Sequence, residues 1–331
     1  MTEFTFVIPD PTGFISGGNS YNRQFIDAMH QFGGSVSHMT YDQFRTSPKG
    51  GTCHIIDTIY FENILRDRTS VPAGSIGLIH HLASLFPLSE EVFEQVDRPV
   101  LQQFAAFIVS SIFTRDYLRS HGLSQPVVVI EPAKKAINRS TTARTGKVNA
   151  IMVNNIVPRK GVLAFLETIA KEKIPPYYRI QIVGDLDSDA EYARACMHIV
   201  QNDSLLKRTI HFPGLQDDPT VTKLYARSNL FISSSFMETF GMSVQEASIV
   251  GLPLLVLDGG NTSNHVRQGV NGWVEDSVKN LAKRLDFIVS HPELFIDIQQ
   301  KAHSYQHPYV ESYQDGAEMF LEFVKRLLKV Q

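Results

Sequence analysis

The chain has 331 residues, enough for about two domains that each bury a hydrophobic core. Hydrophobic residues make up 43% and charged residues 20%, which is typical of a globular protein and argues against a disordered or membrane-embedded chain. The formal net charge of -3 gives no indication of a nucleic-acid partner.

The first part of the chain alternates apolar runs with amphipathic segments. Buried strands are predicted at residues 4–9, 52–60, 75–82, 107–111 and 127–130. Phe25, Met29 and Phe32 recur at helical spacing and predict a helix over residues 20–32. Two more helices are expected around residues 89–95 and 101–107. This alternation predicts an α/β domain built on a parallel sheet.

Two features lie where strands of this sheet are expected to end. A Ser-Gly-Gly-Asn sequence, with Gly17 and Gly18 at its centre, occupies the predicted loop over residues 10–19. Such a sequence suits a phosphate cradle, although glycine pairs are also common in plain turns. His80 and His81 end another strand, and because adjacent side chains point to opposite faces, at most one of them is expected to line a ligand site. A packed structural role is the alternative for His81.

Residues 133–166 contain no Asp or Glu, but they contain Lys134, Lys135, Arg139, Arg144, Lys147, Arg159 and Lys160. The Ser/Thr-rich sequence INRSTTARTGK in the middle of this segment is the best candidate for a domain linker. A solvated linker accounts for the first five cations, and phosphate steering is the alternative. We expect an N-terminal domain over residues 1–145, a second domain over residues 146–310 and a final segment over residues 311–331, with a helix at 312–328.

The second domain repeats the α/β pattern. Strands are predicted at residues 150–154, 178–183 and 210–215, and a Pro-Arg-Lys-Gly turn at residues 158–161 leads into a helix through Ile169. Asp185 and Asp187 have the spacing of a metal-binding pair, but they lie in a predicted strand-to-helix turn. His303 and His307 could hold zinc on a helix, yet no third ligand is near in sequence. Neither pair is therefore assigned to a metal.

The segment over residues 231–274 carries the strongest pattern, in the order strand, polar loop, helix, strand. Gly241 permits a backbone conformation that other residues avoid, so the helix is predicted to start near Met242 or Ser243, with Ser243 as a candidate cap. An open helix start beyond a strand's carboxyl end offers N–H groups and a positive dipole end to a diphosphate. Glu238 precedes this helix start and Glu246 lies about one turn inside it.

This segment resembles the signature of family 4 retaining glycosyltransferases of the GT-B fold, in which two glutamates eight positions apart flank a Phe-Gly turn. The motifs in family order are the serine-ended strand, Glu-Thr-Phe-Gly at residues 238–241, Glu246-Ala247, Gly-Leu-Pro at 251–253 and Gly-Val-Asn-Gly at 269–272. The resemblance implies two Rossmann-like, doubly wound domains facing across a cleft. It also implies a C-terminal helix that crosses back to the first domain, which would bind the acceptor.

The resemblance implies roles for individual residues. Glu246 would accept hydrogen bonds from the donor ribose, Glu238 would hold hydroxyls of the transferred sugar, and Lys160 would bind the diphosphate. His80 matches the family histidine that contacts the donor sugar. The remaining donor-binding candidates are Gly17, Gly18, Asn155, Arg159, Gly214, Leu215, Thr239, Phe240, Gly241, Met242 and Ser243. Asn155 departs from the family pattern, which has an arginine five residues before the lysine. Either Arg159 or another basic residue replaces that cation, or catalysis is weak or absent, and both alternatives stay open.

The resemblance also sets the expected ligands and reaction. The donor would be a nucleoside diphosphate sugar of the UDP or GDP type, with no cofactor and no metal, because amides and Lys160 would neutralise the diphosphate. A glycan, lipid or small-molecule hydroxyl would accept the sugar. Only two cysteines are present and no signal peptide is evident, so a cytoplasmic protein is expected, with peripheral membrane contact left open. A nucleotide-binding scaffold without turnover is the alternative function. A dinucleotide oxidoreductase is disfavoured because the glycines lack the G-x-G-x-x-G order.

Overall fold

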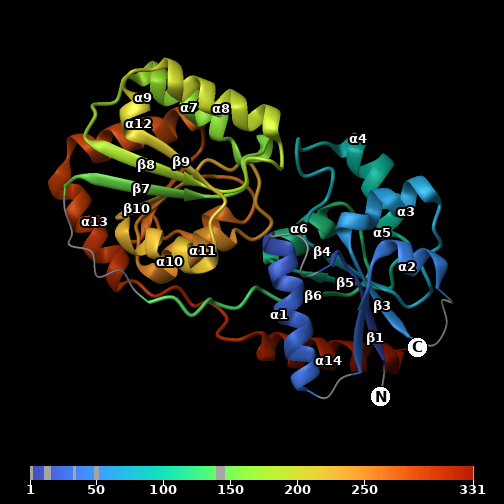
Figure 1. Cartoon of the computed structure of the whole chain (residues 1–331). Helices are drawn as coiled ribbons and strands as arrows, with labels where there is room; N and C mark the ends of the chain where they lie inside the picture. The colour runs from blue at the N-terminus through green and yellow to red at the C-terminus, as the bar shows by residue number, and fades with distance from the viewer. Residues whose placement is uncertain (1–2, 11–15, 33–34, 48–51, 139–145, 331) are drawn as a thin grey trace. The chain divides into compact units, whose positions relative to one another are not determined.

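A computed structural model describes residues 3–10, 16–32, 35–47, 52–138 and 146–330. The chain divides into two compact units, each an α/β structure with its own parallel sheet (Figure 1). Unit 1 comprises residues 1–133 and 309–331, and unit 2 comprises residues 134–308. The middle of the predicted linker, residues 139–145, lies outside the described residues.

Unit 1 contains a six-stranded parallel sheet in the order β2-β1-β3-β4-β5-β6. Its strands are β1 (Phe4–Val7), β2 (Val36–Met39), β3 (Cys53–Asp57), β4 (Ile76–Ile79), β5 (Ala106–Val109) and β6 (Val127–Val129). Three of them, β1, β4 and β5, are buried at every position, as expected of strands covered by helices on both faces.

The helices of unit 1 lie in the connections between these strands, except for the final helix, which follows unit 2 in sequence. They are α1 (Gly17–Gln31), α2 (Tyr41–Thr46), α3 (Phe61–Asp67), α4 (Glu90–Val92), the π-helical turn η2 (Phe93–Asp97), α5 (Arg98–Leu101), α6 (Ile112–Ser120) and the final α14 (Tyr313–Val330), with a 3₁₀ turn η1 (Thr58–Tyr60). Figure 1 shows α14 beside α1, and Phe320 of α14 packs in one core with Phe4 and Phe25.

Unit 2 contains a second six-stranded parallel sheet, in the order β12-β11-β10-β7-β8-β9. Its strands are β7 (Val148–Val153), β8 (Tyr178–Val183), β9 (Ile210–Gly214), β10 (Leu230–Ser233), β11 (Leu254–Leu257) and β12 (Gly272–Glu275). Counted from β7, this is the doubly wound Rossmann order, which confirms the predicted fold of this unit.

Hydrophobic clusters lie on both faces of this second sheet, because its strands carry apolar side chains that point to either face. The helices are α7 (Val162–Glu172), α8 (Ala190–Asn202), α9 (Leu206–Thr209), α10 (Asp218–Arg227), α11 (Met242–Val250), α12 (Val278–Ser290) and α13 (Pro292–Ser304), with 3₁₀ turns η3 (Pro158–Lys160) and η4 (Thr262–His265). Among the helices that the structure describes, none is both long and apolar enough to cross a membrane.

Two local predictions in unit 1 are wrong. Gly17 and Gly18 do not lie in a loop: they form the first turn of α1, because the Ser16 hydroxyl accepts a hydrogen bond from the Asn19 amide and caps the helix there. Part of the predicted loop, residues 11–15, lies outside the described residues. The helix expected over residues 101–107 ends at Leu101, because the apolar residues from Ala106 onward join the sheet as β5.

Candidate active site

The strand order of unit 2 reverses between β7 and β10, which are neighbours in the sheet although β8 and β9 lie between them in sequence. Open α/β sheets place their ligands beyond the carboxyl ends of the strands at such a switch point. Here the segment after β7 carries Asn155, Arg159 and Lys160, and the segment after β10 carries Glu238. The sheet topology therefore places these four candidate residues at the same edge of the sheet.

Lys160 and Glu238 form an ion pair at this position. The Lys160 ammonium donates a hydrogen bond to Glu238 Oε1, and each side chain is only 11% exposed. The Arg159 guanidinium lies 3.7 Å from Glu238 Oε2 and donates to the Met237 carbonyl at 3.3 Å. The structure thus brings together two residues that are 78 positions apart in sequence.

Backbone contacts fix the position of this pair. The Ser234 hydroxyl donates to the Lys160 carbonyl at 2.8 Å, and the Phe236 amide donates to the Arg159 carbonyl at 2.9 Å. Gly161, at φ +65°, follows the lysine; any Cβ there would collide with the Ser234 backbone oxygen. The two loops can therefore approach closely only because residue 161 is glycine.

The electrostatics of the pair follow from its burial. Burial alone raises the pKa of the Glu238 carboxyl, but the Lys160 and Arg159 cations outweigh this effect and hold the pKa below its ordinary value. Burial lowers the pKa of Lys160, and the Glu238 carboxylate opposes that shift. Glu238 is accordingly an ionised carboxylate at neutral pH, held in place by cations.

The Phe240-Gly241 turn leads into α11. Gly241 has φ +96° and is the N-cap of α11, and no side chain caps the helix start, so the predicted cap by Ser243 is wrong. The Phe240 carbonyl accepts hydrogen bonds from Asn261 Nδ2 at 3.0 Å and from His265 Nε2 at 2.6 Å. These contacts hold the turn while leaving the start of α11 uncapped, as the sequence analysis required for anion binding.

His265 and Asn261 were missed by the sequence analysis. Burial lowers the pKa of His265 to about 4, so its imidazole is neutral and donates through Nε2–H. Its edge also packs against the Phe240 ring, with the ring centroids 5.0 Å apart. In the sequence, only the Gly-Gly pair at residues 259–260, which directly precedes Asn261, indicates that two backbone segments approach each other closely here. An added Cβ at either glycine would meet backbone atoms of residues 235–238.

Glu246 lies one turn inside α11 with its side chain 15% exposed, and it contacts a residue that the sequence analysis assigned to a solvated linker. Lys135 Nζ lies 3.5 Å from Glu246 Oε1 and 3.0 Å from Asp218 Oδ1. Burial raises the pKa of Glu246, partly opposed by Lys135 and by the nearby Tyr225 hydroxyl. For Lys135, the prediction of a freely solvated cation is wrong.

Comparison of the chain with models of protein families identifies the kind of protein that carries this arrangement. The model of the family described as glycosyl transferases group 1 matches residues 133–305, just over half of the chain. The chain belongs to this family. Its matched segment begins just before Lys135 and contains Lys160, Glu238 and Glu246.

Solved structures agree with the fold of this glycosyltransferase. Sucrose-phosphate synthase from Thermosynechococcus elongatus is similar over 100% of both chains, with 16% identity and a TM-score of 0.75. Anabaena Alr3699/HepE, solved in complex with UDP and glucose, is similar over 98% of this chain and 100% of its own, with 14% identity and a TM-score of 0.72. These similarities confirm the predicted GT-B fold. No curated protein sequence matches the chain.

The glycosyltransferase carries His80 in unit 1, beyond the end of β4. His80 Nε2 donates to Asn22 Oδ1 at 2.7 Å, and Asn22 Nδ2 donates to Asp57 Oδ2 at 2.7 Å. Burial lowers the pKa of His80, although the Asp57 carboxylate opposes this shift. An added Cβ at Gly18 would lie 3.3 Å from the His80 ring, so Gly18 packs against the histidine.

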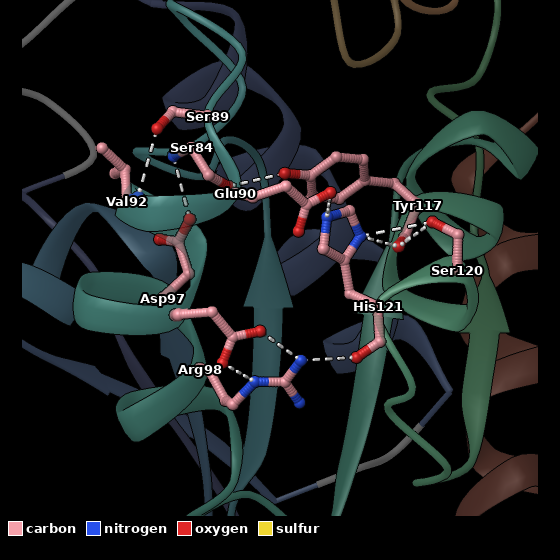
Figure 2. Close-up of polar contacts among 10 residues, drawn as sticks. Ser84, Ser89, Glu90, Val92, Asp97, Arg98, Tyr117, Ser120 and His121 are labelled. Carbon is pink, nitrogen blue, oxygen red and sulfur yellow. Dashed lines mark hydrogen bonds and ion pairs between the residues drawn. The ribbon is translucent and has the colours of Figure 1, made fainter.

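In the glycosyltransferase, polar contacts hold the loop after β4 against neighbouring helices (Figure 2). The buried Asp97 carboxylate accepts the amide of Ser84 at 2.9 Å, and the Ser84 and Tyr117 hydroxyls are 2.7 Å apart. The His121 ring packs between Phe93 and Tyr117. This network orders the loop next to His80, on the edge of the sheet where the strands end.

The other predicted donor-binding residues of the glycosyltransferase also lie beyond strand ends in unit 2. Asn155 follows β7, and its carbonyl accepts the Val157 amide at 3.0 Å. Gly214 ends β9 with φ +75°, and the next residue, Leu215, is 50% exposed. Thr239 and Met242 flank the Phe240-Gly241 turn. Across the part of the chain that the structure describes, no three His, Cys, Asp or Glu side chains are grouped as a metal site.

Proposed function

We propose that the protein transfers a sugar, with retention of configuration and without a metal ion, from a UDP- or GDP-type nucleoside diphosphate sugar to a hydroxyl acceptor. The observation that supports this best is the buried Lys160 and Glu238 pair at the switch point of unit 2, beside the uncapped start of α11. A fixed cation and unpaired amides suit a diphosphate leaving group.

Each group in this arrangement has a specific task. Lys160 and the amides at the start of α11 stabilise the departing diphosphate, which takes the place of a metal ion. Glu238 binds hydroxyls of the transferred sugar near the developing positive charge, and Glu246 binds the donor ribose. A phosphate oxygen accepts the proton of the acceptor hydroxyl, so no side-chain nucleophile is needed. For His80, the family resemblance supports a contact with the transferred sugar.

The nature of donor and acceptor is part of the proposal. UDP is the first nucleotide to test because Anabaena HepE, of similar fold, was solved with UDP and glucose. A hexose is the first sugar to test for the same reason. We place the protein in the cytoplasm, in the assembly of a glycan, where a lipid-linked acceptor would add peripheral membrane contact.

The proposal is tested by incubating purified protein with UDP- and GDP-hexoses and measuring release of the nucleotide, with and without EDTA. We expect release that EDTA does not abolish, and an NMR spectrum of the product that shows the anomeric configuration of the donor. Lys160→Ala should lower turnover by roughly 10²-fold or more, because it removes a transition-state cation. Wild-type rates in this variant would refute the assignment of Lys160.

A second candidate function is nucleotide binding without turnover. Two observations favour it: Asn155 supplies no charge where the family has an arginine, and the Lys160 ammonium is already neutralised by Glu238. Calorimetry distinguishes the two functions, because a scaffold would bind the nucleoside diphosphate sugar and leave it intact.

A further inference from the structure

The segment around Lys135 is held against α11 by packing. The Ile137 amide donates to the Lys135 carbonyl at 2.8 Å, which makes a tight turn at Ala136. Ile137 packs against the apolar cluster that includes Val244 and Ala247 of α11. The turn therefore presents Lys135 to this helix from a fixed position, although most of the predicted linker follows it in sequence.

Lys135 lies between two carboxylates with different exposure. Its ammonium is 3.0 Å from Asp218 Oδ1, which is at the solvent-exposed start of α10, and 3.5 Å from Glu246 Oε1, which is mostly buried. An exposed ion pair contributes little, but a cation beside a buried carboxylate has a large effect on that carboxylate. The contact with Glu246 is therefore the one with functional consequences.

The chemistry of ribose recognition requires a charged carboxylate at Glu246. An ionised carboxylate offers acceptor sites on both oxygens and can receive both hydroxyls of a 2′,3′-diol, whereas a protonated carboxyl has one oxygen occupied by its own proton. Three titratable groups face Glu246: Lys135, Asp218 and Tyr225. Of these only Lys135 is a cation.

We infer that Lys135 is a positioning residue for the nucleotide ribose. It acts through Glu246, because it keeps that carboxylate charged and aligned for the 2′ and 3′ hydroxyls. This inference rests on the proposed function, because it takes Glu246 as the ribose-binding group. Lys135 itself does not touch the reacting atoms.

The test compares the affinities of UDP and 2′,3′-dideoxy-UDP by isothermal titration calorimetry at neutral pH. For the wild type we expect UDP to bind at least roughly tenfold more tightly, which corresponds to one charge-assisted hydrogen bond. In Lys135→Met this ratio should fall to about twofold. Lys135→Arg should restore it in part, because it returns the positive charge.

Lys134→Met is the matched control, because it removes the same charge from the adjacent, exposed residue and should leave the ratio unchanged. Thermal unfolding without ligand shows whether each variant is folded. The pH dependence gives an independent readout. Without Lys135, the buried Glu246 protonates at higher pH, so in Lys135→Met the preference for UDP should be regained only at a higher pH than in the wild type.

Each outcome decides the inference. If Lys135→Met kept the wild-type ratio, Lys135 would be an ordinary ion pair and the inference would be refuted, with the proposed function intact. If the variant bound UDP more tightly, Lys135 would compete with the ribose, which also contradicts it. If the wild type bound none of UDP, GDP and ADP, the proposed function would be wrong and the role of Lys135 with it.

Discussion

At the scale of single residues, the most informative feature is the buried pair of Lys160 and Glu238. Taking two charges out of water costs free energy that their attraction need not recover, so such a pair is weak evidence for a stabilising role. Its position at the switch point of the sheet gives a better reason for its presence. In the proposed donor complex, the diphosphate would bind Lys160 and a sugar hydroxyl would bind Glu238. Each would replace part of the contact between the two side chains.

The first prediction concerns the stability of this pair. Glu238→Gln should lower the free energy of unfolding by about 3–5 kcal/mol at neutral pH, because Lys160 loses its carboxylate while it stays buried. The double variant Lys160→Met, Glu238→Gln should be more stable than Glu238→Gln alone. Urea unfolding of the three proteins provides the measurement, and a double variant less stable than Glu238→Gln would contradict the prediction.

The same substitution has a predicted pH dependence. The pKa of Glu238 is lower in the folded protein than in the unfolded chain, where it is about 4.3. The stabilisation is therefore complete above that pH and is lost as the pH falls through the folded value. The gap in stability between wild type and Glu238→Gln should narrow below about pH 4. A gap that stays constant between pH 7 and pH 3 would show that Glu238 does not titrate as stated.

His265 gives a second pH-dependent prediction. Its folded pKa of about 4 lies below the unfolded value of about 6.5, so the neutral imidazole stabilises the protein above pH 6.5, and this contribution is lost as the pH falls toward 4. The loss amounts to about 3 kcal/mol. Unfolding curves of His265→Gln should lack this part of the acid destabilisation, and the full wild-type acid destabilisation in this variant would contradict the prediction.

The sequence identified some of these residues and missed others for a physical reason. Glu238, Glu246 and Lys160 belong to local motifs whose spacing is visible in the chain. Lys135 does not, because only the fold brings its partners Asp218 and Glu246 close to it. From sequence alone, a lysine in a polar segment is expected to be solvated. The role of His265 likewise depends on a carbonyl 25 residues earlier.

At the scale of elements, the site depends on how closely two strand-to-helix connections approach. The turn after β7 and the loop after β10 exchange hydrogen bonds through Ser234 and Phe236. Gly161 permits this contact in two ways: it has positive φ, and it leaves room for the Ser234 oxygen. The geometry of Lys160 is therefore set by a neighbouring glycine as much as by its own side chain.

This contact predicts unequal costs for two glycine substitutions. Gly161→Ala should destabilise the protein by more than about 2 kcal/mol, because it combines an unfavourable φ with a collision against backbone. Gly269→Ala is the matched control in the same unit: its φ is +71°, but nothing lies within 4 Å of the added Cβ, so about 1 kcal/mol is expected. Chemical denaturation measures both, and equal costs would mean that the backbones do not meet at Gly161.

Most elements could be predicted from the sequence, because their apolar runs and periodicity are strong. The errors are of two kinds. Strand β2 and the helices α2, α3, α12 and α13 were not predicted at all, and other elements were predicted with wrong boundaries. The Gly17-Gly18 pair was expected in a loop, since glycine disfavours helices, but the Ser16 cap and the apolar face of α1 outweigh that preference. The helix expected over residues 101–107 failed because a short apolar run does not distinguish a helix from a buried strand.

At the scale of the whole molecule, unit 1 is built from two separate parts of the chain. Ala317, Phe320 and Val324 of α14 belong to the same core as Phe4 and Phe25 of β1 and α1. The Phe320 ring lies 5.2 Å from the Phe4 ring and 5.8 Å from the Phe25 ring, measured between centroids. The sequence showed that this helix has an apolar face, but only the family resemblance indicated where it docks.

The last prediction tests this shared core. Phe320→Ala should cost about 3–5 kcal/mol, because it removes a fully buried aromatic ring. The adjacent Met319 is 50% exposed, so Met319→Ala should have little effect. Hydrogen exchange should become faster in β1 and α1 of Phe320→Ala and stay unchanged in α7 and α12. Faster exchange throughout both units would show that they do not unfold separately.

The divided sequence of unit 1 has a consequence for its synthesis on the ribosome. Residues 134–308 leave the exit tunnel as one uninterrupted stretch and can complete their own sheet during translation. Residues 1–133 carry the six strands of the unit 1 sheet but not α14, so the apolar surface around Phe4 and Phe25 stays uncovered until that helix emerges. Unit 2 can therefore be complete before the core of unit 1 is, and the surface that waits for α14 is open in that interval to aggregation or to capture by a chaperone.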